Sequence, residues 1–309
     1  MKKFRPNSKG IIYVAFGYEY LLMAANSAFT AKKFNPEVAC SVITNVKIND
    51  KNLLKEYFDE IYYEDSKNEL NRFYKTRALD YASFARGAFL DCDTEVQGDL
   101  APALACLEKY DIILKMTPRP SIKDYRISRE IHGSEFPMWN SGVIFFNNDE
   151  PAKRLFSSWA ELFKEMEGRS DQPALARAVF ENAEVRLLSV NYMWNAFPSD
   201  LILAKTGHEP RVRIWHYRNP HEFPEVARRI FQHHQAVTRA LDLTDIEARK
   251  EIDKTEKKYK ILCSGFYQSG LLRPFYLRCL KIIGKLGMGP RPELSRTKKR
   301  TGSRYKNFD

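Results

Sequence analysis

Short apolar runs that suit buried strands alternate with longer segments of helical periodicity through the first half of the chain. Ile11–Phe16 is rich in β-branched and aromatic residues and too short for a helix, whereas the apolar residues of Glu19–Lys33 recur at helical spacing. The alternation continues as strand Val38–Ile43, helix Asn52–Phe58, strand Glu60–Tyr63, helix Thr76–Phe84, strand Gly87–Leu90, helix Leu100–Lys109 and strand Asp111–Lys115. This order predicts an α/β fold with a mostly parallel central sheet and helices on both faces, which binds ligands beyond the carboxyl ends of its strands.

The pattern changes in the second half of the chain. Thr117–Pro137 is polar, contains three prolines and has no clear period, so we expect a long loop of the kind that commonly forms a lid. Beyond it the sequence predicts strand Gly142–Phe146, helix Pro151–Glu167, helix Gln172–Glu181, strand Val185–Leu188, an aromatic segment Tyr192–Phe197 and strand Val212–Trp215. No internal repeat is visible, so one α/β domain at residues 1–249 accounts for these elements.

The excess positive charge lies at one end of the chain. The net charge is +11, and residues 250–309 carry all of it, with 16 Lys and Arg against 5 Asp and Glu. In this tail, Leu271–Leu286 has apolar residues on one side and basic residues on the other, and Arg291–Lys306 adds a polybasic stretch. The pattern predicts a helix in the interface of an anionic membrane; the alternative is a helix docked on the domain itself. Nucleic acid is a disfavoured partner because no known nucleic-acid-binding module is recognisable.

Two further features bear on the cellular location. No apolar run approaches the roughly 20 residues that a bilayer-spanning helix needs, and no secretory leader is visible. The five cysteines are odd in number and lack CxxC spacing, so we expect reduced thiols rather than disulfides or a zinc site. These features predict a cytoplasmic protein, peripheral on the inner face of the cell membrane through its tail.

Two carboxylates stand directly after an expected strand, in the run from Phe89 to Thr94. Asp91 and Asp93 lie where the strand leaves the sheet, so their side chains are able to converge on one hard cation. The competing interpretation is a loop with two solvated acids, because this spacing is common by chance.

A histidine ends the last expected strand, in the run Ile214–Tyr217. A lone histidine is more often an ordinary packed or surface residue, so His216 gains meaning only in combination with other ligands. Two carboxylates and one imidazole suit Mn²⁺ or Mg²⁺, with the remaining positions left for phosphate oxygens of a substrate. A structural zinc site would be closed and rich in thiolates, which this set is not.

Five motifs follow one another in a fixed order between residues 10 and 218. They are Tyr74–Leu79, Ala88–Thr94, Trp139–Phe146, Ser170–Leu175 and Val212–His216. Together they resemble the GT-A-fold nucleotide-sugar glycosyltransferases, and most closely the glycosyltransferase family 8-like enzymes. The chain departs from the family pattern after the last motif, where Tyr217–Pro220 replaces a segment that usually contains glycine and lysine.

The resemblance implies a metal-dependent enzyme of GT-A fold that moves a hexose from a UDP-sugar to a saccharide or lipid-linked saccharide acceptor. It makes Asp91, Asp93 and His216 the ligands of a Mn²⁺ or Mg²⁺ ion that holds the donor diphosphate. Such an ion stabilises the negative charge that develops on the leaving nucleoside diphosphate.

The resemblance also carries roles to residues outside the metal site. It assigns catalytic roles to Asn140, near the donor sugar and acceptor, and to Asp171 and Gln172, which face the sugar hydroxyls or the reaction centre. It assigns substrate-binding roles to Ala15, Phe16, Gly17, Tyr18, Lys75, Arg77, Cys92, Ser141, Gly142 and Asn195. Among these, Phe16 or Tyr18 would stack on the base, and Lys75 and Arg77 would contact phosphate or donor sugar. The alternatives are a plain strand-to-helix turn at residues 15–18, solvated cations at 75 and 77, and helix capping by Asp171.

The stereochemical course and the enzyme class have alternatives at this stage. The family resemblance favours retention of anomeric configuration, for which no protein base is needed, whereas inversion requires a carboxylate base and Asp171 is the only candidate. A sugar-phosphate nucleotidyltransferase is the nearest rival enzyme, but the exit of the first strand, Ala15–Tyr18, lacks the Gly-rich, Arg-containing loop of that class. A nucleic-acid-binding protein with an inactive α/β domain is the rival from another class.

Overall fold

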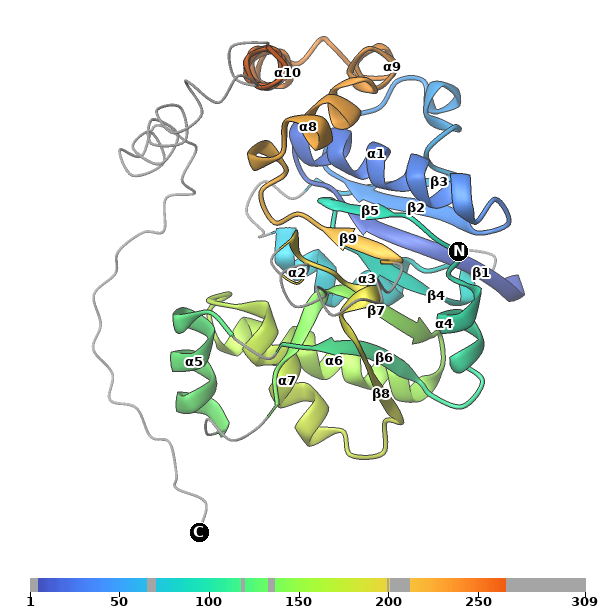
Figure 1. Ribbon diagram of the computed structural model, residues 1–309, viewed down its shortest axis with the longest axis vertical. Helices are drawn as coiled ribbons and strands as arrows, with labels where there is room; N and C mark the ends of the chain where they lie inside the picture. The colour runs from blue at the N-terminus through green and yellow to red at the C-terminus, as the bar shows by residue number, and fades with distance from the viewer. Residues whose placement is uncertain are drawn as a thin grey trace, which may run out of the picture. The chain divides into compact units, whose positions relative to one another are not determined.

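Seven strands form one twisted sheet, which lies between layers of helices (Figure 1). They are β1 (Arg5–Val14), β2 (Ala39–Thr44), β3 (Glu60–Tyr63), β4 (Phe84–Leu90), β6 (Ile112–Met116), β7 (Trp139–Asn147) and β8 (Leu187–Val190), in the spatial order β3-β2-β1-β4-β7-β6-β8. Only β7 runs antiparallel to its neighbours; the other pairings are parallel. The computed structural model describes residues 5–65, 71–117, 120–132, 137–198, 200 and 212–264.

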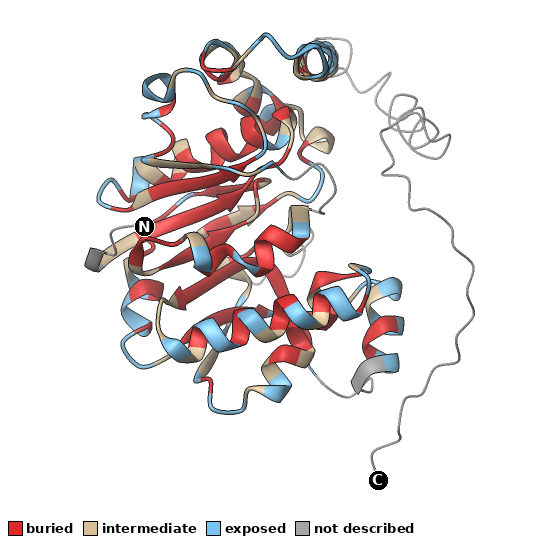
Figure 2. Ribbon diagram, turned by 180° about the vertical axis from the view of Figure 1, so that it is seen from behind, coloured by how far each residue is buried: buried red, intermediate tan, exposed pale blue. Residues whose placement is uncertain are grey.

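Helices cover both faces of this sheet, which confirms the expected fold class. They are α1 (Tyr18–Phe34), α2 (Asn71–Thr76), α3 (Ala78–Tyr81), α4 (Ala101–Cys106), α5 (Ile122–His132), α6 (Glu150–Glu165), α7 (Asp171–Glu181), α8 (Pro224–Phe231), α9 (His234–Arg239) and α10 (Ile246–Leu262). Alternate residues of β1 separate the two faces. Ile12 and Val14 belong to the core cluster that includes α6 and α7, whereas the hydroxyl of Tyr13 accepts a hydrogen bond from Ser27 of α1. The central strands between these layers are buried along most of their length, whereas the edge strands β3 and β8 are only half-buried (Figure 2).

A second, small sheet stands apart from the first. It pairs β5 (Thr94–Val96) with β9 (Ile214–His216) in antiparallel fashion, with Thr94 opposite His216. We call it the β5–β9 ribbon. Because β5 follows β4 after three residues, the ribbon brings the end of the last strand beside the carboxyl end of β4. The antiparallel direction of β7 matters in the same way. It places Val143 opposite Leu90 at the end of β4, so that Asn140–Gly142 lie next to the residues that follow this strand.

Three expectations about secondary structure are wrong. The expected helix Asn52–Phe58 is instead a short 3-10 helix, Lys51–Leu54, followed by a turn. The expected loop Thr117–Pro137 contains helix α5, because its three prolines lie before and after the helical residues and none interrupts them. The expected helix Thr76–Phe84 is instead the end of α2, a single short turn α3 and the start of β4. Phe84 belongs to the strand because its ring is buried over two glycines, Gly10 and Gly87, where any side chain would overlap it.

The C-terminal helices α8, α9 and α10 pack against α1. Helix α10 spans Ile246–Leu262, so the division expected at residue 249 falls inside it. The expected amphipathic helix Leu271–Leu286 and the polybasic stretch Arg291–Lys306 lie outside the described residues. Among the residues that are described, no helix combines the length and apolar character that crossing a bilayer would require.

Candidate active site

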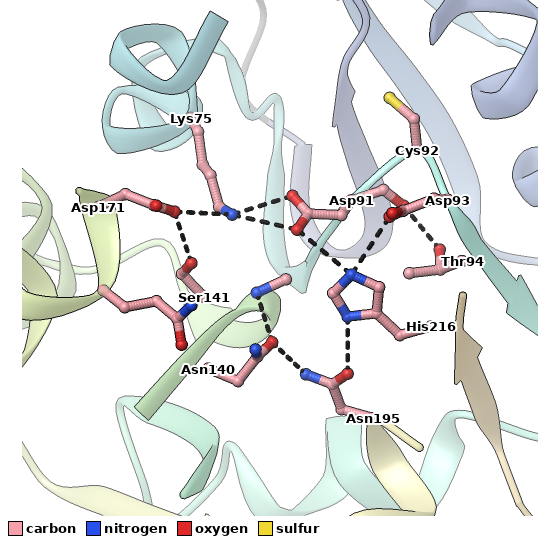
Figure 3. Close-up of polar contacts among 12 residues, drawn as sticks. Lys75, Asp91, Cys92, Asp93, Thr94, Asn140, Ser141, Asp171, Asn195 and His216 are labelled. Atoms are coloured by element: carbon pink, nitrogen blue, oxygen red, sulfur yellow. Dashed lines mark hydrogen bonds and ion pairs between the residues drawn. The ribbon is translucent and has the colours of Figure 1, made fainter. Parts of the chain in front are cut away.

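Asp91, Asp93 and His216 meet at the edge of the sheet where β4 ends (Figure 3). Nε2 of His216 lies 3.2 Å from Oδ1 of Asp93 and 3.7 Å from Oδ2 of Asp91. The turn between β4 and β5 is fixed by its own backbone, because the carbonyl of Asp91 accepts hydrogen bonds from both the amide and the hydroxyl of Thr94. One candidate ligand atom from each of the three residues lies within 4.8 Å of the other two.

A hydrogen-bond chain behind His216 determines which ring nitrogen carries the proton when the imidazole is neutral. The amide of Gly142 donates to Oδ1 of Asn140 at 2.9 Å, so the group of Asn195 that also reaches this oxygen, at 2.7 Å, must be its NH₂. Oδ1 of Asn195 then faces Nδ1 of His216 at 3.0 Å and accepts its proton. When the ring is neutral, this arrangement leaves the lone pair on Nε2, on the side of the carboxylates, as a metal ligand requires.

The absence of a side chain at Gly142 gives this cluster its room. A Cβ atom there would overlap Cε1 of His216 and lie 2.7 Å from Oδ2 of Asp91. Two carboxylates and one imidazole around this space form a donor set that suits Mn²⁺ or Mg²⁺. Asp91, Asp93 and His216 therefore fit a divalent cation.

Lys75 lies on the other side of Asp91 and joins it to the start of helix α7. Its ammonium lies 2.9 Å from Oδ1 of Asp91 and 3.1 Å from Oδ2 of Asp171, and only 8% of its side chain is exposed. The hydroxyl of Ser141 donates to the same oxygen of Asp171 at 2.7 Å. Asp171 is thus the first residue of α7 and a buried ion-pair partner, while the N-cap position belongs to Ser170.

The charges of this cluster shift one another's pKa values. Burial lowers the pKa of Lys75, but Asp91 and Asp171 outweigh burial, so the pKa is raised overall. Burial raises the pKa of Asp171, yet Lys75 and other nearby donors bring it down to about 2. Burial raises the pKa of Asp91 by more than Lys75 and His216 lower it. Burial also raises the pKa of Asp93, but the charge and hydrogen bond of a protonated His216, a backbone hydrogen bond and Lys75 together outweigh burial, so the pKa falls.

These side chains form one wall of a cavity of about 340 Å³. Ten of the residues expected at the site line this cavity: Lys75, Asp91, Cys92, Asp93, Asn140, Ser141, Gly142, Asp171, Gln172 and His216. The structure therefore brings together the expected metal ligands, the expected catalytic residues and part of the expected substrate-binding set.

The segment expected to cradle the base does not line the cavity. Tyr18 is buried, and its hydroxyl bonds to His234 and Thr238 on the side of the C-terminal helices. The ring of Phe16 packs against that of Tyr74, with centroids 4.7 Å apart. Ala15 is fully buried beside them.

Gly17 and Arg77 also lie away from the cavity. Gly17 has φ +88°, and a Cβ there would lie 2.7 Å from a carboxylate oxygen of Glu251 in α10. Arg77 pairs with Asp80 at 2.9 Å on the surface. Asn195 is fully buried behind His216, where it orients the ring, so its contacts are with other protein groups.

Nine further residues line the cavity that were not named individually as site residues from the sequence: Val14, Tyr20, Asn71, Arg72, Phe89, Thr117, Ser121, Asp124 and Arg218. Arg72 lies one helical turn before Lys75, a spacing that would have indicated it once α2 was placed correctly. Ser121 and Asp124 belong to the segment Thr117–Pro137, which was expected as a loop without assigned site residues and which contains α5. Arg218 carried no signal, because its left-handed backbone (φ 47°) and the packing of its guanidinium over Phe197 depend on the folded chain.

Comparison with solved structures supports the fold seen here. The galactosyltransferase LgtC, solved with donor and acceptor sugar analogs, has a TM-score of 0.53 at 14% identity, over 78% of this chain and 99% of that one. The glycosyltransferase GlyE of Streptococcus pneumoniae TIGR4 has a TM-score of 0.52 at 13% identity, over 86% of this chain and 64% of that one. At such low identity, the likeness concerns the fold.

Comparison of sequences gives the family. No curated protein sequence matches the chain significantly. The model of glycosyl transferase family 8, however, matches residues 18–221, which is about two thirds of the chain and contains the cluster described above. The chain therefore belongs to glycosyl transferase family 8 and is a glycosyltransferase of GT-A fold.

Proposed function

We propose that this glycosyltransferase moves a hexose from a UDP-sugar to a saccharide acceptor and needs Mn²⁺ or Mg²⁺ to do so. The observation that carries the proposal is the convergence of Asp91, Asp93 and His216 on the wall of one cavity. When bound there, the cation would neutralise charge on the diphosphate as the bond to the anomeric carbon breaks.

The surrounding side chains suggest a division of labour. The ammonium of Lys75 forms ion pairs with both Asp91 and Asp171, so it offsets the repulsion between these two carboxylates. In this way it keeps a candidate metal ligand and a residue of the cavity wall in place. Arg72 and Arg218 line the cavity with guanidinium groups and would bind phosphate oxygens. Arg218 belongs to the segment that departs from the family pattern, and so would replace the cation usually found there.

An enzyme orients a sugar by hydrogen bonds between its hydroxyl groups and protein donors and acceptors at fixed positions. Asn140, Ser141 and Gln172 supply amide and hydroxyl groups on the cavity wall, and Gln172 is itself oriented by Thr117, whose hydroxyl lies 3.3 Å from its side-chain oxygen. We propose that these groups contact the transferred hexose.

We propose retention of the anomeric configuration. Inversion would need a carboxylate that takes the acceptor proton, and Asp171 is the candidate named from the sequence. Its pKa of about 2 and its ion pair with Lys75 make it a weak base at neutral pH. A retaining reaction avoids this difficulty, since the leaving diphosphate is able to take the proton.

For the acceptor we propose a saccharide or a lipid-linked saccharide at an anionic membrane surface. The support is the excess of basic residues over positions 250–309 of the sequence.

The proposal is tested by UDP release from a panel of UDP-hexoses, with Mn²⁺, with Mg²⁺ and with a chelator. We expect metal-dependent turnover of one donor, and a loss of about 100-fold or more in Asp93→Asn. Asp253→Asn, an exposed change on α10, is the matched control and should behave as the parent. NMR of the product gives the anomeric configuration. Turnover of nucleoside triphosphates with release of pyrophosphate, and none of UDP-sugars, would instead establish a nucleotidyltransferase.

A further inference from the structure

The β5–β9 ribbon carries two of the three candidate metal ligands, yet it is small. Asp93 directly precedes β5, and His216 is the last residue of β9. The ribbon has only three residue pairs, and a two-stranded ribbon of this kind is marginally stable by itself. The spacing between the two ligands therefore depends on what packs against the ribbon.

Glu95, in the middle of β5, ties the ribbon to helices α1 and α8. Its side chain is 2% exposed, so its charge must be compensated by neighbouring donors. Asn26 of α1 donates to Oε1 at 3.0 Å and the hydroxyl of Tyr217 donates to Oε2 at 3.3 Å. Arg229 of α8 reaches both oxygens, with Nε 2.9 Å from Oε1 and Nη2 2.8 Å from Oε2.

The arginine contact is the strongest of these. It is bidentate and charge-assisted, so it fixes the carboxylate in direction as well as in place. Glu95 lies opposite Trp215, one step along the ribbon from the pair of Thr94 and His216. The amide of Tyr217 also donates to the carbonyl of Asp93 at 2.9 Å, so a shift of β5 against β9 would move both ligands.

We infer that Arg229 is a positioning residue for the metal site, acting through Glu95 on the β5–β9 ribbon. This inference rests on the proposed function, because it takes Asp91, Asp93 and His216 as the metal ligands. It extends the functional unit past residue 221, where the family match ends, to helix α8. Arg229 itself does not line the cavity, so its effect is on the ligands and not on substrate.

The experiment measures the Mn²⁺ dissociation constant directly, from the electron paramagnetic resonance signal of free Mn²⁺, with no substrate present. Loss of a residue that orients metal ligands typically weakens binding by about 10- to 100-fold, so we expect at least about a tenfold higher constant in Arg229→Met. Arg228→Met, an exposed neighbour on the same helix, is the matched control and should bind Mn²⁺ like the parent. Each protein is measured at a temperature at which circular dichroism shows it fully folded.

Arg229→Lys covers the case in which the methionine variant does not fold. A lysine keeps the charge but has no fork to reach both oxygens of Glu95 as Arg229 does, so we expect weaker Mn²⁺ binding here too. Folded variants that bind Mn²⁺ with the parent's constant would overturn the inference, even if their thermal stability is lower. Failure of the proposed function gives a different result, namely a folded parent that does not bind Mn²⁺, or one that Asp93→Asn leaves unchanged.

Discussion

Gly142 illustrates how one residue without a side chain sets the room available to a candidate metal site. It lies where His216 and Asp91 approach the start of β7, and its amide begins the hydrogen-bond chain that orients the imidazole. We expect Gly142→Ala to displace the ligands and to raise the Mn²⁺ dissociation constant by at least about tenfold, measured by the same resonance titration.

Gly98→Ala is the matched control for that substitution. Its added Cβ would meet only the flexible side chain of Arg213, which is able to move aside, so Mn²⁺ binding should be unchanged. Equal binding by the parent and Gly142→Ala would show that His216 and Asp91 do not hold the cation.

Asp171 gives a prediction about acid stability. Its pKa is about 2 in the folded protein against an ordinary value of 3.8, so folding favours the charged form. The resulting stability is fully present above pH 3.8 and is lost as the pH falls towards 2, and it amounts to about 2 kcal/mol. Urea unfolding between pH 4.5 and about 2 should therefore show a shallower loss of stability in Asp171→Asn than in the parent. An identical pH slope in the two proteins would mean that the ion pair with Lys75 does not form.

At the level of elements, the packing of the C-terminal helices on the rest of the chain depends on buried neutral histidines. Burial lowers the pKa of His233 to about 4, and burial followed by the charge of Lys258 does the same for His221. Each ring takes up a proton more readily in the unfolded chain than in the folded one. Stability from these contacts is therefore complete above about pH 6.5 and is lost as the pH falls from there towards 4.

The variant His233→Phe tests this. It keeps an aromatic ring against Tyr57 and Phe29, which contact His233 at centroid distances of 5.2 and 5.0 Å, but it cannot be protonated. We expect the urea midpoint of this variant to fall less between pH 7 and about 5 than that of the parent. Gln235→Ala, an exposed change on helix α9, whose N-cap is His233, should keep the parent's pH dependence. A variant that follows the parent at every pH would show that His233 is not buried in its neutral form.

Elements differ in how far the sequence could predict them. Strands such as β4 and helices such as α6 have local signals, namely apolar runs and helical spacing, and these predicted most of the fold. Helix α5 was missed because it is polar and is held by contacts made after folding, such as Ser170 with Asp124. Short α3 and the first residues of β4 were missed because the ring of Phe84 fills a space over two glycines, Gly10 of the neighbouring strand β1 and Gly87 of β4 itself.

For the molecule as a whole, the sequence predicted the candidate site best where a residue type that binds metals stands at or just after the end of an expected strand. Asp91, Asp93 and His216 are such positions. Arg72, Arg218 and the pair of Glu95 with Arg229 were not foreseen, because their roles follow from which elements meet in space. The direction of β7 and the β5–β9 ribbon bring distant segments to one edge of the sheet, and no local pattern encodes that meeting.

The most direct test of the account is thermal unfolding of the whole protein with UDP, with and without Mn²⁺, beside the double variant Asp91→Asn/Asp93→Asn. UDP at about 100 times its dissociation constant should stabilise the parent by about 2.7 kcal/mol, only when Mn²⁺ is present and not in the double variant. A folded parent that UDP and Mn²⁺ leave unshifted, or a double variant that shifts as much as the parent, would contradict a metal-dependent donor site at Asp91, Asp93 and His216.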